Sequence, residues 1–431
     1  MGSPVHLQER AAAALALAIG AAAAFSSLSP RASVLLLIIV GIASAALCQP
    51  KARALIARGL KGPIIITGAV LLTYLVWSAG WALDQAAALS KTAGVAVIAA
   101  VAAVSFAGIG ELDGVAARRA AKIFLMGAAV GAVFVAIEFA TGQSITRALF
   151  NIVPILRPED GKDVAVDGGR VVKIARYELN RNIAVLVLLL WPALAVLLQG
   201  QERWRIWLAA AAVALTGLLA FSSEHESSMI AISVGVAVLL AGMLGRRLVG
   251  RALTVAWCLA FLLIVPASLL AYQKAELHHA AWLPTTAQAR IIIWGYTAEQ
   301  VVKNPVLGIG VRSTRVLDTA LLPSAERAEG DVFARRPGRH AHNLFLQSWF
   351  ELGLIGVVLV MGFGVLILRR LANLPHELQP FAYALFGTFM AIASFAWGMW
   401  QTWLLAAYAL SALYFALAVR LSTSNIGKDS R

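Results

Sequence analysis

Long apolar runs separated by polar connections dominate the sequence. Most runs are long enough to cross a lipid bilayer as a helix, which takes about 17–25 residues. The pattern therefore predicts an all-α fold, a polytopic transmembrane helical bundle that forms a single membrane domain over residues 1–431. The predicted spans, about twelve, cover residues 11–28, 33–48, 63–83, 91–108, 119–141, 182–200, 204–221, 227–246, 252–272, 343–368, 379–398 and 402–419.

The composition agrees with a membrane protein. The chain is 60% hydrophobic and only 13% charged, whereas a soluble protein carries about 25% charged residues. Its two cysteines, Cys48 and Cys258, fall within apolar runs, so neither a disulfide framework nor a metal-thiolate site is expected. The first run follows Arg10 and resembles a signal peptide. We expect an uncleaved first span instead, because the charge pattern of the connections requires it.

Basic residues are distributed unevenly over the two faces that these spans define. Short connections on one face carry only Arg31 and Lys91. The other face is much richer in Lys and Arg, so the positive-inside rule places it and both termini in the cytoplasm. This basic set comprises Arg10, Lys51, Arg53, Arg58, Lys61, Arg118, Arg119, Lys122, Arg203, Arg205, Arg246, Arg247, Arg251, Arg369, Arg370, Arg420, Lys428 and Arg431.

Two long loops, residues 142–181 and 273–342, are predicted on the far face, since long loops cross a membrane largely regardless of charge. The net charge of +14 can reflect topology or a site for anionic ligands. Nucleic acid is not an expected partner, because no basic soluble domain interleaved with aromatic residues is present. In the first loop, residues 145–153 form a predicted amphipathic helix that ends at Pro154, and residues 158–169 are irregular.

The second loop contains a helix of the soluble type. Residues 285–288 fit a capping box at the start of a helix over residues 287–303, which Asn304-Pro305 ends. Residues 308–310, G-I-G, permit a tight turn. Residues 324–338 are rich in Gly, Pro and charge, which predicts an irregular, mobile segment.

A polar stretch at the end of this loop carries the strongest candidate chemistry. It lies at residues 335–343, where the loop enters the predicted span 343–368. Imidazole can act as a general base near neutral pH, and arginine binds phosphate oxygens through a fork of donors. The stretch therefore fits a reaction on a lipid-linked phosphate or pyrophosphate. Its polar residues are Arg335, Arg336, Arg339, His340, His342 and Asn343.

Structural explanations remain open for the same residues. The arginines can bind phospholipid headgroups, and Asn343 can cap the following helix. Arg290 and Trp294 lie one turn apart on the predicted loop helix. They can bind a phosphate and stack on a sugar, or they can be a snorkelling arginine and an interfacial tryptophan.

Three further groups lie on the far face. Glu224-His225-Glu226 can form an acid/base group or a solvated turn, and support for a metal site there is weak. Arg176 and Arg181 precede the span 182–200 and can bind an anionic substrate. We expect an arginine of this loop to pair with Glu138, because an unpaired acid inside a span is costly. The pair His278-His279 has no assigned role.

Two strings make the chain similar to a known family. H-A-H-N-L-F-L-Q-x-x-x-E-L-G-L-I-G begins at His340, and A-x-A-R-I-I-I-W-G-Y-x-x-x-x-V-V-K-N-P-V-L-G-I-G surrounds Arg290. With the many-span topology, they resemble the O-antigen ligase family, which includes O-antigen and exopolysaccharide polymerases. The resemblance implies a membrane glycosyltransferase of the bacterial inner membrane, with a periplasmic active site and no metal or cofactor. Its partners would be an undecaprenyl-pyrophosphate-linked glycan donor, a lipid A core or glycan acceptor, and membrane lipids.

The resemblance also assigns residues. The family histidine falls on His342, with His340 beside it, and the family arginine falls on Arg290. One departure concerns the turn between the seventh and eighth spans. Many ligases have a Ser-Arg pair there, whereas this chain reads S-S-E-H-E-S-S, so Arg181 or Arg339 is expected to supply the second cation. A polymerase that extends a carrier-linked chain, and a secondary transporter, are the alternative functions.

Overall fold

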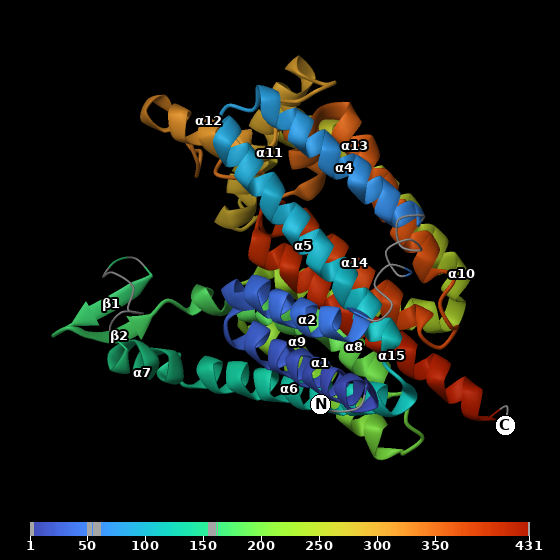
Figure 1. Ribbon diagram of the computed structural model, residues 1–431. Coiled ribbons are helices and arrows are strands. Elements are labelled where there is room, and N and C mark those ends of the chain that lie inside the picture. The colour runs from blue at the N-terminus through green and yellow to red at the C-terminus, as the bar shows by residue number, and fades with distance from the viewer. Residues whose placement is uncertain (1–3, 50–53, 55–61, 154–160, 162, 430–431) are drawn as a thin grey trace.

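The computed structural model describes residues 4–49, 54, 62–153, 161 and 163–429, and it confirms the all-α class (Figure 1). Within these residues, ten helices are long and apolar enough to cross a membrane. The predicted basic connection at Lys51, Arg53, Arg58 and Lys61 lies outside the described residues.

The elements follow the predicted runs closely. The long helices are α1 (Pro4–Leu28), α2 (Ser33–Cys48), α4 (Pro63–Ser78), α5 (Gln85–Glu111), α6 (Gly114–Ala140), α8 (Asn180–Leu197), α9 (Trp204–Ser222), α10 (Glu226–Leu269), α13 (Leu344–Leu371), α14 (Gln379–Phe395) and α15 (Thr402–Asp429). The shorter elements are η1 (Pro30–Ala32), η3 (Ala79–Trp81), α7 (Ser144–Ile152), β1 (Val164–Asp167), β2 (Arg170–Ile174), η5 (Arg176–Leu179), η6 (Leu270–Lys274), η7 (Leu277–His279), α11 (Thr285–Lys303), α12 (Ser313–Leu321) and η8 (Leu322–Ser324).

Two features account for the difference between twelve predicted spans and ten long helices. Helix α10 contains two of the predicted spans, because its 44 residues would extend for about 66 Å, twice the hydrocarbon thickness of about 30 Å. It breaks at Gly245, whose φ of −154° and ψ of 65° are not helical. Helix α14 has only 17 residues. Helices α2 and α4 have 16 each, but they continue into the adjoining turns η1 and η3, which gives spans of 19 residues.

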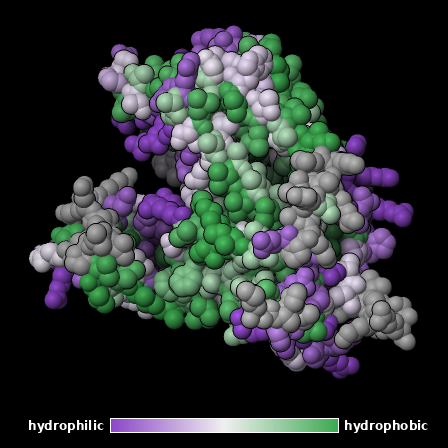
Figure 2. Space-filling model, in the orientation of Figure 1, coloured by the Kyte–Doolittle hydropathy of each residue, from purple (hydrophilic) through white to green (hydrophobic). Residues whose placement is uncertain are grey.

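Helix α8 lies at the centre of the bundle, and 83% of its most apolar 18-residue stretch is buried inside the protein. Helices α1, α6, α14 and α15 pack around it. Figure 2 shows apolar residues over the middle of the visible face and hydrophilic residues gathered towards its upper and lower ends. This banded surface is what a membrane-spanning bundle requires.

Helix α13 is interrupted where the G-I-G segment of the second loop, residues 308–310, approaches it. Gly353 has a φ of 62°, and a Cβ there would lie 2.3 Å from the Val306 carbonyl oxygen. The break frees carbonyls on α13. Phe350 O accepts from the Ile309 N–H at 3.0 Å, and Glu351 O accepts from the Gly310 N–H at 2.9 Å. The tight turn predicted at residues 308–310 is therefore confirmed, with φ values of 66° and 91° at its two glycines.

The first long loop forms an arm that extends from the end of α6 (Figure 1). The amphipathic helix predicted at residues 145–153 is confirmed as α7, and Pro154 lies outside the described residues. Part of the segment predicted as irregular instead forms an antiparallel hairpin of β1 and β2. Asn151 of α7 fastens it, since its side chain both donates to Val171 O and accepts from Val171 N.

The predicted arginine partner of Glu138 was wrong. The fully buried Glu138 carboxylate accepts from the Ile145 N–H at 2.8 Å, the Thr146 N–H at 3.1 Å and the Thr146 hydroxyl. A helix N-terminus presents unpaired N–H groups and a partial positive charge, so it can satisfy a carboxylate without a cation. Glu138 therefore anchors α7 to the bundle.

In the second loop, α11 confirms the predicted helix, and it ends at Asn304 as expected. The predicted capping box was wrong. Pro284 occupies the N-cap, and the Gln288 side chain donates instead to the Ala280 carbonyl at 2.9 Å. Residues 325–343 are irregular, as predicted, up to the start of α13.

Candidate functional site

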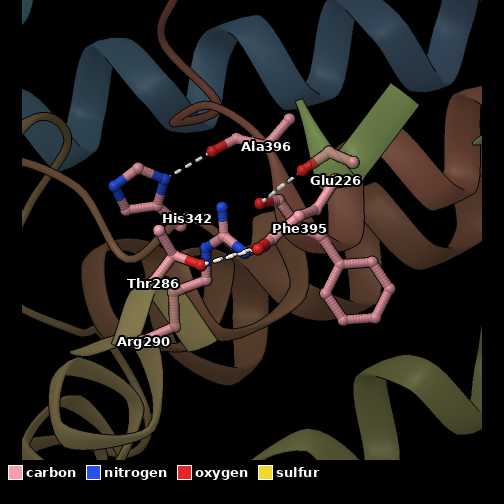
Figure 3. A network of polar contacts seen from close by, with 7 residues as sticks. Glu226, Thr286, Arg290, His342, Phe395 and Ala396 are labelled. Atoms are coloured by element: carbon pink, nitrogen blue, oxygen red, sulfur yellow. Dashed lines mark hydrogen bonds and ion pairs between the residues drawn. The ribbon is translucent and has the colours of Figure 1, made fainter. Parts of the chain in front are cut away.

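Four segments that are distant in sequence meet at one end of the bundle (Figure 3). They are the turn between α9 and α10, the first turns of α11, the residues before α13, and the segment between α14 and α15. Hydrogen bonds join them: Ser227 Oγ donates to Phe395 O at 3.0 Å, and Thr286 Oγ1 donates to the Glu226 carboxylate at 2.9 Å. The predicted site residues His342 and Arg290 both lie here.

His342 is oriented by a backbone carbonyl. It has a φ of 52°, a conformation that few residues other than glycine adopt. Its Nδ1 lies within hydrogen-bonding distance of the Ala396 carbonyl oxygen. A carbonyl can only accept, so Nδ1 carries the proton and Nε2 of the neutral ring has a free lone pair. Burial, together with His340 and the Arg290 guanidinium, lowers the pKa of His342 to about 3.

Arg290 lies between His342 and Glu226 in Figure 3. Its Nη1 is 3.3 Å from Glu226 Oε2, and its side chain remains 21% exposed. The carboxylate orients the guanidinium from one side and leaves other N–H groups of the planar fork available. The α9–α10 turn thus contributes an acid, Glu226, that positions Arg290.

Trp294 and Asn343 hold the loop in place. The Trp294 indole Nε1 donates to the Ala341 carbonyl at 2.7 Å, directly beside His342. Asn343 caps α13, as predicted, because its Oδ1 accepts from the Leu346 N–H at 2.9 Å. Its amide also donates to Ser394 O at 3.1 Å. These contacts give both residues structural roles, independent of any substrate-binding role.

His340 packs against His342, with ring centroids 4.0 Å apart. Burial, together with the Arg339 and Arg315 guanidinium groups, lowers the pKa of His340 to about 4. Arg339 itself is exposed. Two cations are therefore close enough to affect His340.

His225 is also near the cluster but is turned into the protein. Its Nδ1 lies 2.6 Å from Ser228 Oγ, and its ring packs on Trp397 with centroids 4.7 Å apart. Burial, together with the charge of Arg290, lowers the pKa of His225 to about 4. Since Glu226 pairs with Arg290, the three residues 224–226 do not converge as one set of metal ligands.

Arg176 and Arg181 make their contacts elsewhere. Arg181 pairs with Glu178 at 3.1 Å, and the Arg176 guanidinium lies 5.2 Å above the Phe139 ring. The other two arginines of the polar stretch are also engaged: Arg335 pairs with Glu299 at 2.5 Å, and Arg336 pairs with Asp318. Among the predicted arginines, Arg290 and Arg339 are thus the two that accompany the histidines.

Three groups that contribute to the candidate site were not predicted from the sequence. The role of Glu226 as the partner of Arg290 depends on a contact across 64 positions. The Ala396 carbonyl has no side-chain signature, and it lies within the predicted span 379–398, for which no break was predicted. Glu351 is fully buried in α13 and accepts a hydrogen bond from Trp400 Nε1 in the same segment.

An apolar groove of about 320 Å³ leads to this cluster from the side of the bundle. Its lining includes Trp294, Asn343 and Phe395 next to the cluster, and Leu259 and Leu263 of α10 at the other end. These two leucines are 43% and 52% exposed. The groove therefore joins the apolar outer surface to the polar site.

Comparison with known proteins identifies related chains. Residues 211–361 match the family profile described as O-antigen ligase. A Rickettsia conorii protein is 25% identical over 234 residues, which cover 53% of this chain and 55% of that protein. A Rickettsia prowazekii protein is 24% identical over 247 residues, which cover 57% of this chain and 58% of that protein. Both are named "putative polysaccharide ligase".

The matched regions span little more than half the length of these relatives. The profile match nevertheless includes Glu226, Arg290, His340 and His342, and so most of the site. The chain is a multi-pass membrane protein with ten long apolar helices in its described part. The predicted resemblance to the O-antigen ligase family is therefore confirmed over residues 211–361.

Proposed function

We propose that this protein transfers a polysaccharide from undecaprenyl pyrophosphate to the lipid A core, at the periplasmic face of the bacterial inner membrane. The observation that carries the proposal is the orientation of His342. Its Nδ1–H is bonded to the Ala396 carbonyl, so Nε2 is free to take a proton. Arg290, the nearby cation, is suited to an anionic leaving group.

The proposed reaction is an inverting glycosyl transfer. Nε2 of His342 removes the proton from an acceptor hydroxyl as the hydroxyl oxygen bonds to the anomeric carbon of the donor sugar. The bond from this carbon to the pyrophosphate oxygen breaks, and the pyrophosphate leaves with the electron pair. Arg290 and Arg339 stabilise the negative charge that grows on it. The reacting centre needs no metal ion for these steps.

The low pKa of His342 fits this sequence of events. Burial keeps the ring neutral before substrate binds. A pyrophosphate beside the ring would favour the protonated form, because an opposite charge within about 4–6 Å raises the pKa of an imidazole. The base would therefore become stronger when the donor is in place.

The groove between α10, α13 and α14 supports a lipid-linked donor. Its exposed leucines continue the apolar surface, and its inner end reaches Trp294 and Asn343 beside the cluster. A polyprenyl chain in this groove would place its pyrophosphate near Arg290. We propose this groove as the lateral entry route of the donor.

The test is transfer in proteoliposomes with a polyprenyl-pyrophosphate-linked glycan and a lipid A core acceptor. His342→Ala should lower the rate by about 10²–10⁴-fold, the usual contribution of a general base. His376→Ala, on an exposed histidine between α13 and α14, is the control and should leave the rate unchanged. A His342→Ala variant with the wild-type rate would exclude this mechanism.

A gel of surface glycolipids from a deletion strain separates the alternative functions. A ligase predicts that the polymer ladder disappears while long chains remain on the carrier. A polymerase predicts lipid A core with a single repeat. Solute uptake into proteoliposomes would indicate a transporter.

A further inference from the structure

A second polar cluster lies outside the proposed active site. It consists of His278 and His279 in η7 and Asp331 in the irregular loop before α13. One ligand atom from each residue lies within 4.8 Å of the other two. His279 Nε2 is 3.1 Å and His278 Nε2 is 3.8 Å from the same carboxylate oxygen, Asp331 Oδ1.

The two histidines differ in how well their nitrogens are satisfied. The His278 side chain is only 8% exposed, and within the described residues its Nδ1 has no hydrogen-bond partner. Its Nε2 points towards Asp331 from 3.8 Å, which is too far for a hydrogen bond. An ion bound between Nε2 and Asp331 Oδ1 would fill the 3.8 Å gap between these two atoms and give Nε2 a partner, while Nδ1 would stay as it is.

The donor set matches a first-row transition metal. Imidazole and carboxylate ligands bind Zn²⁺ at about 2.0–2.2 Å, which places the ligand atoms of a tetrahedral ion about 3.3 Å apart. The observed separations of 3.1 and 3.8 Å lie on either side of this value. Asp331 is only 4% exposed whereas His279 is 46% exposed, so the cluster is closed on one side and open to water on the other.

We propose that His278, His279 and Asp331 form a binding site for Zn²⁺, with water in the fourth position. The site would be structural. It joins the end of the α10 segment to the loop that leads to His340, and the loop is already held nearby by Arg335, whose guanidinium lies 5.8 Å above the Tyr272 ring. Tyr272 in turn packs on His278, with ring centroids 4.5 Å apart. The ion would therefore fix the loop without touching the reacting groups.

The test measures Zn²⁺ on the full-length protein, purified in detergent without a polyhistidine tag. After dialysis against limiting Zn²⁺, elemental analysis should find about one ion per chain, since the cluster forms one site. His278→Ala and Asp331→Asn should each weaken binding by at least about 100-fold, because loss of a ligand exceeds the 10–100-fold effect of losing an outer-shell contact. His376→Ala should bind like the wild type.

A measurement on the wild-type protein avoids dependence on the folding of the variants. Co²⁺ in a tetrahedral site gives intense visible absorption, and Zn²⁺ should abolish it by competition. Wild-type protein that binds Zn²⁺ no better than Asp331→Asn, or Co²⁺ that stays weakly coloured as in water, would overturn the proposal and leave only a hydrogen-bonded His279–Asp331 pair. Either result leaves the proposed transferase function untouched, because the site shares no residue with it.

Discussion

Glu138 and Glu351 attach the two long loops to the bundle by the same kind of contact. Each is a fully buried glutamate in a long helix, and each accepts N–H groups at the start of a nine-residue helix. Glu138 holds α7. Glu351 holds α12, through the Arg312 N–H at 2.6 Å and the Thr314 N–H at 3.2 Å. The residue before each short helix has a left-handed backbone, with φ values of 63° and 61°.

The two anchors differ in what else they contact. Glu351 also accepts from Gln347 Nε2 at 3.1 Å and from Trp400 Nε1. Gln347 Oε1 accepts from the Met399 N–H at 3.2 Å. Residues 399 and 400 follow Ala396, whose carbonyl orients His342. Glu351 thus links the second long loop to the candidate site, whereas Glu138 holds only the arm formed by the first long loop.

The largest effect is expected from Glu351→Ala. It leaves donors on Arg312, Thr314, Gln347 and Trp400 without their acceptor. The bonds from Thr314 and Gln347 are buried, and each orphaned buried group costs about 1–3 kcal/mol. Thermal unfolding should show a loss of at least about 3 kcal/mol. Transfer should fall by about 10²-fold, the effect of a displacement of about 1 Å in a catalytic group.

Glu351→Gln is the matched control, since its amide oxygen still accepts while its NH₂ faces donors. It should retain part of the stability and part of the transfer rate in the same assays. A Glu351→Ala variant with wild-type transfer would mean that the anchor and the site are not linked.

The second-largest difference between the two long loops is expected in their stability at low pH. His340 and His342 have folded-state pKa values of about 4 and about 3, below the usual 6.5, because they are buried. Below pH 6.5 the two histidines bind protons in the unfolded state but not in the folded state. The free energy of unfolding is therefore highest above this pH and falls as the pH drops. The loss is about 1.4 kcal/mol per pH unit for each histidine. The first loop, residues 142–181, contains no histidine.

Hydrogen exchange, corrected for its intrinsic pH dependence, tests this difference between pH 6.5 and 5, above the range in which most carboxylates titrate. Residues 331–347 should lose protection, and residues 144–152 should keep it. His342→Gln should flatten the response of the second loop. Equal loss in both loops would show that the histidines are not responsible.

Glu138→Ala should have a smaller effect, limited to the arm. The N–H groups of Ile145 and Thr146 that it accepts are only part-buried, so water can replace the carboxylate in part. We expect a loss of about 1–2 kcal/mol. Hydrogen exchange in α7 should rise while transfer stays near the wild-type rate. A transfer defect as large as that of Glu351→Ala would mean that the arm belongs to the site.

These comparisons also indicate which features a sequence can predict. The spans, the end of α11 at Asn304 and the cap at Asn343 depend on residues within a few positions, and they were predicted. The partners of Glu138 and the hairpin of β1 and β2 depend on how two segments meet. Hydrophobic periodicity carries no information about such contacts, so an arginine, the commonest partner of an acid, was predicted for Glu138.

The features of the candidate site also separate into those that the sequence predicts and those that depend on the fold. Family resemblance assigned His342 and Arg290, because they are side chains in recognisable strings. The acceptor that selects the tautomer of His342 is a main-chain carbonyl at Ala396, and any residue could provide it. The turn E-H-E was noticed for its chemistry, but the pairing of Glu226 with Arg290 needed the fold. Functional side chains were thus easier to predict than the groups that position them.

The smallest expected effect separates the hydroxyl from the N–H groups in the first anchor. Thr146→Val keeps the shape of the side chain and both N–H donors but removes the hydroxyl that donates to Glu138. We expect α7 to lose about 1 kcal/mol, the usual contribution of one hydrogen bond, seen as faster exchange in residues 144–152. Thr319→Val is the matched control in α12, because its exposed hydroxyl bonds only to the Arg315 carbonyl of its own helix. If Thr146→Val exchanged no faster than the wild type, the helix N-terminus alone would account for the anchoring of Glu138.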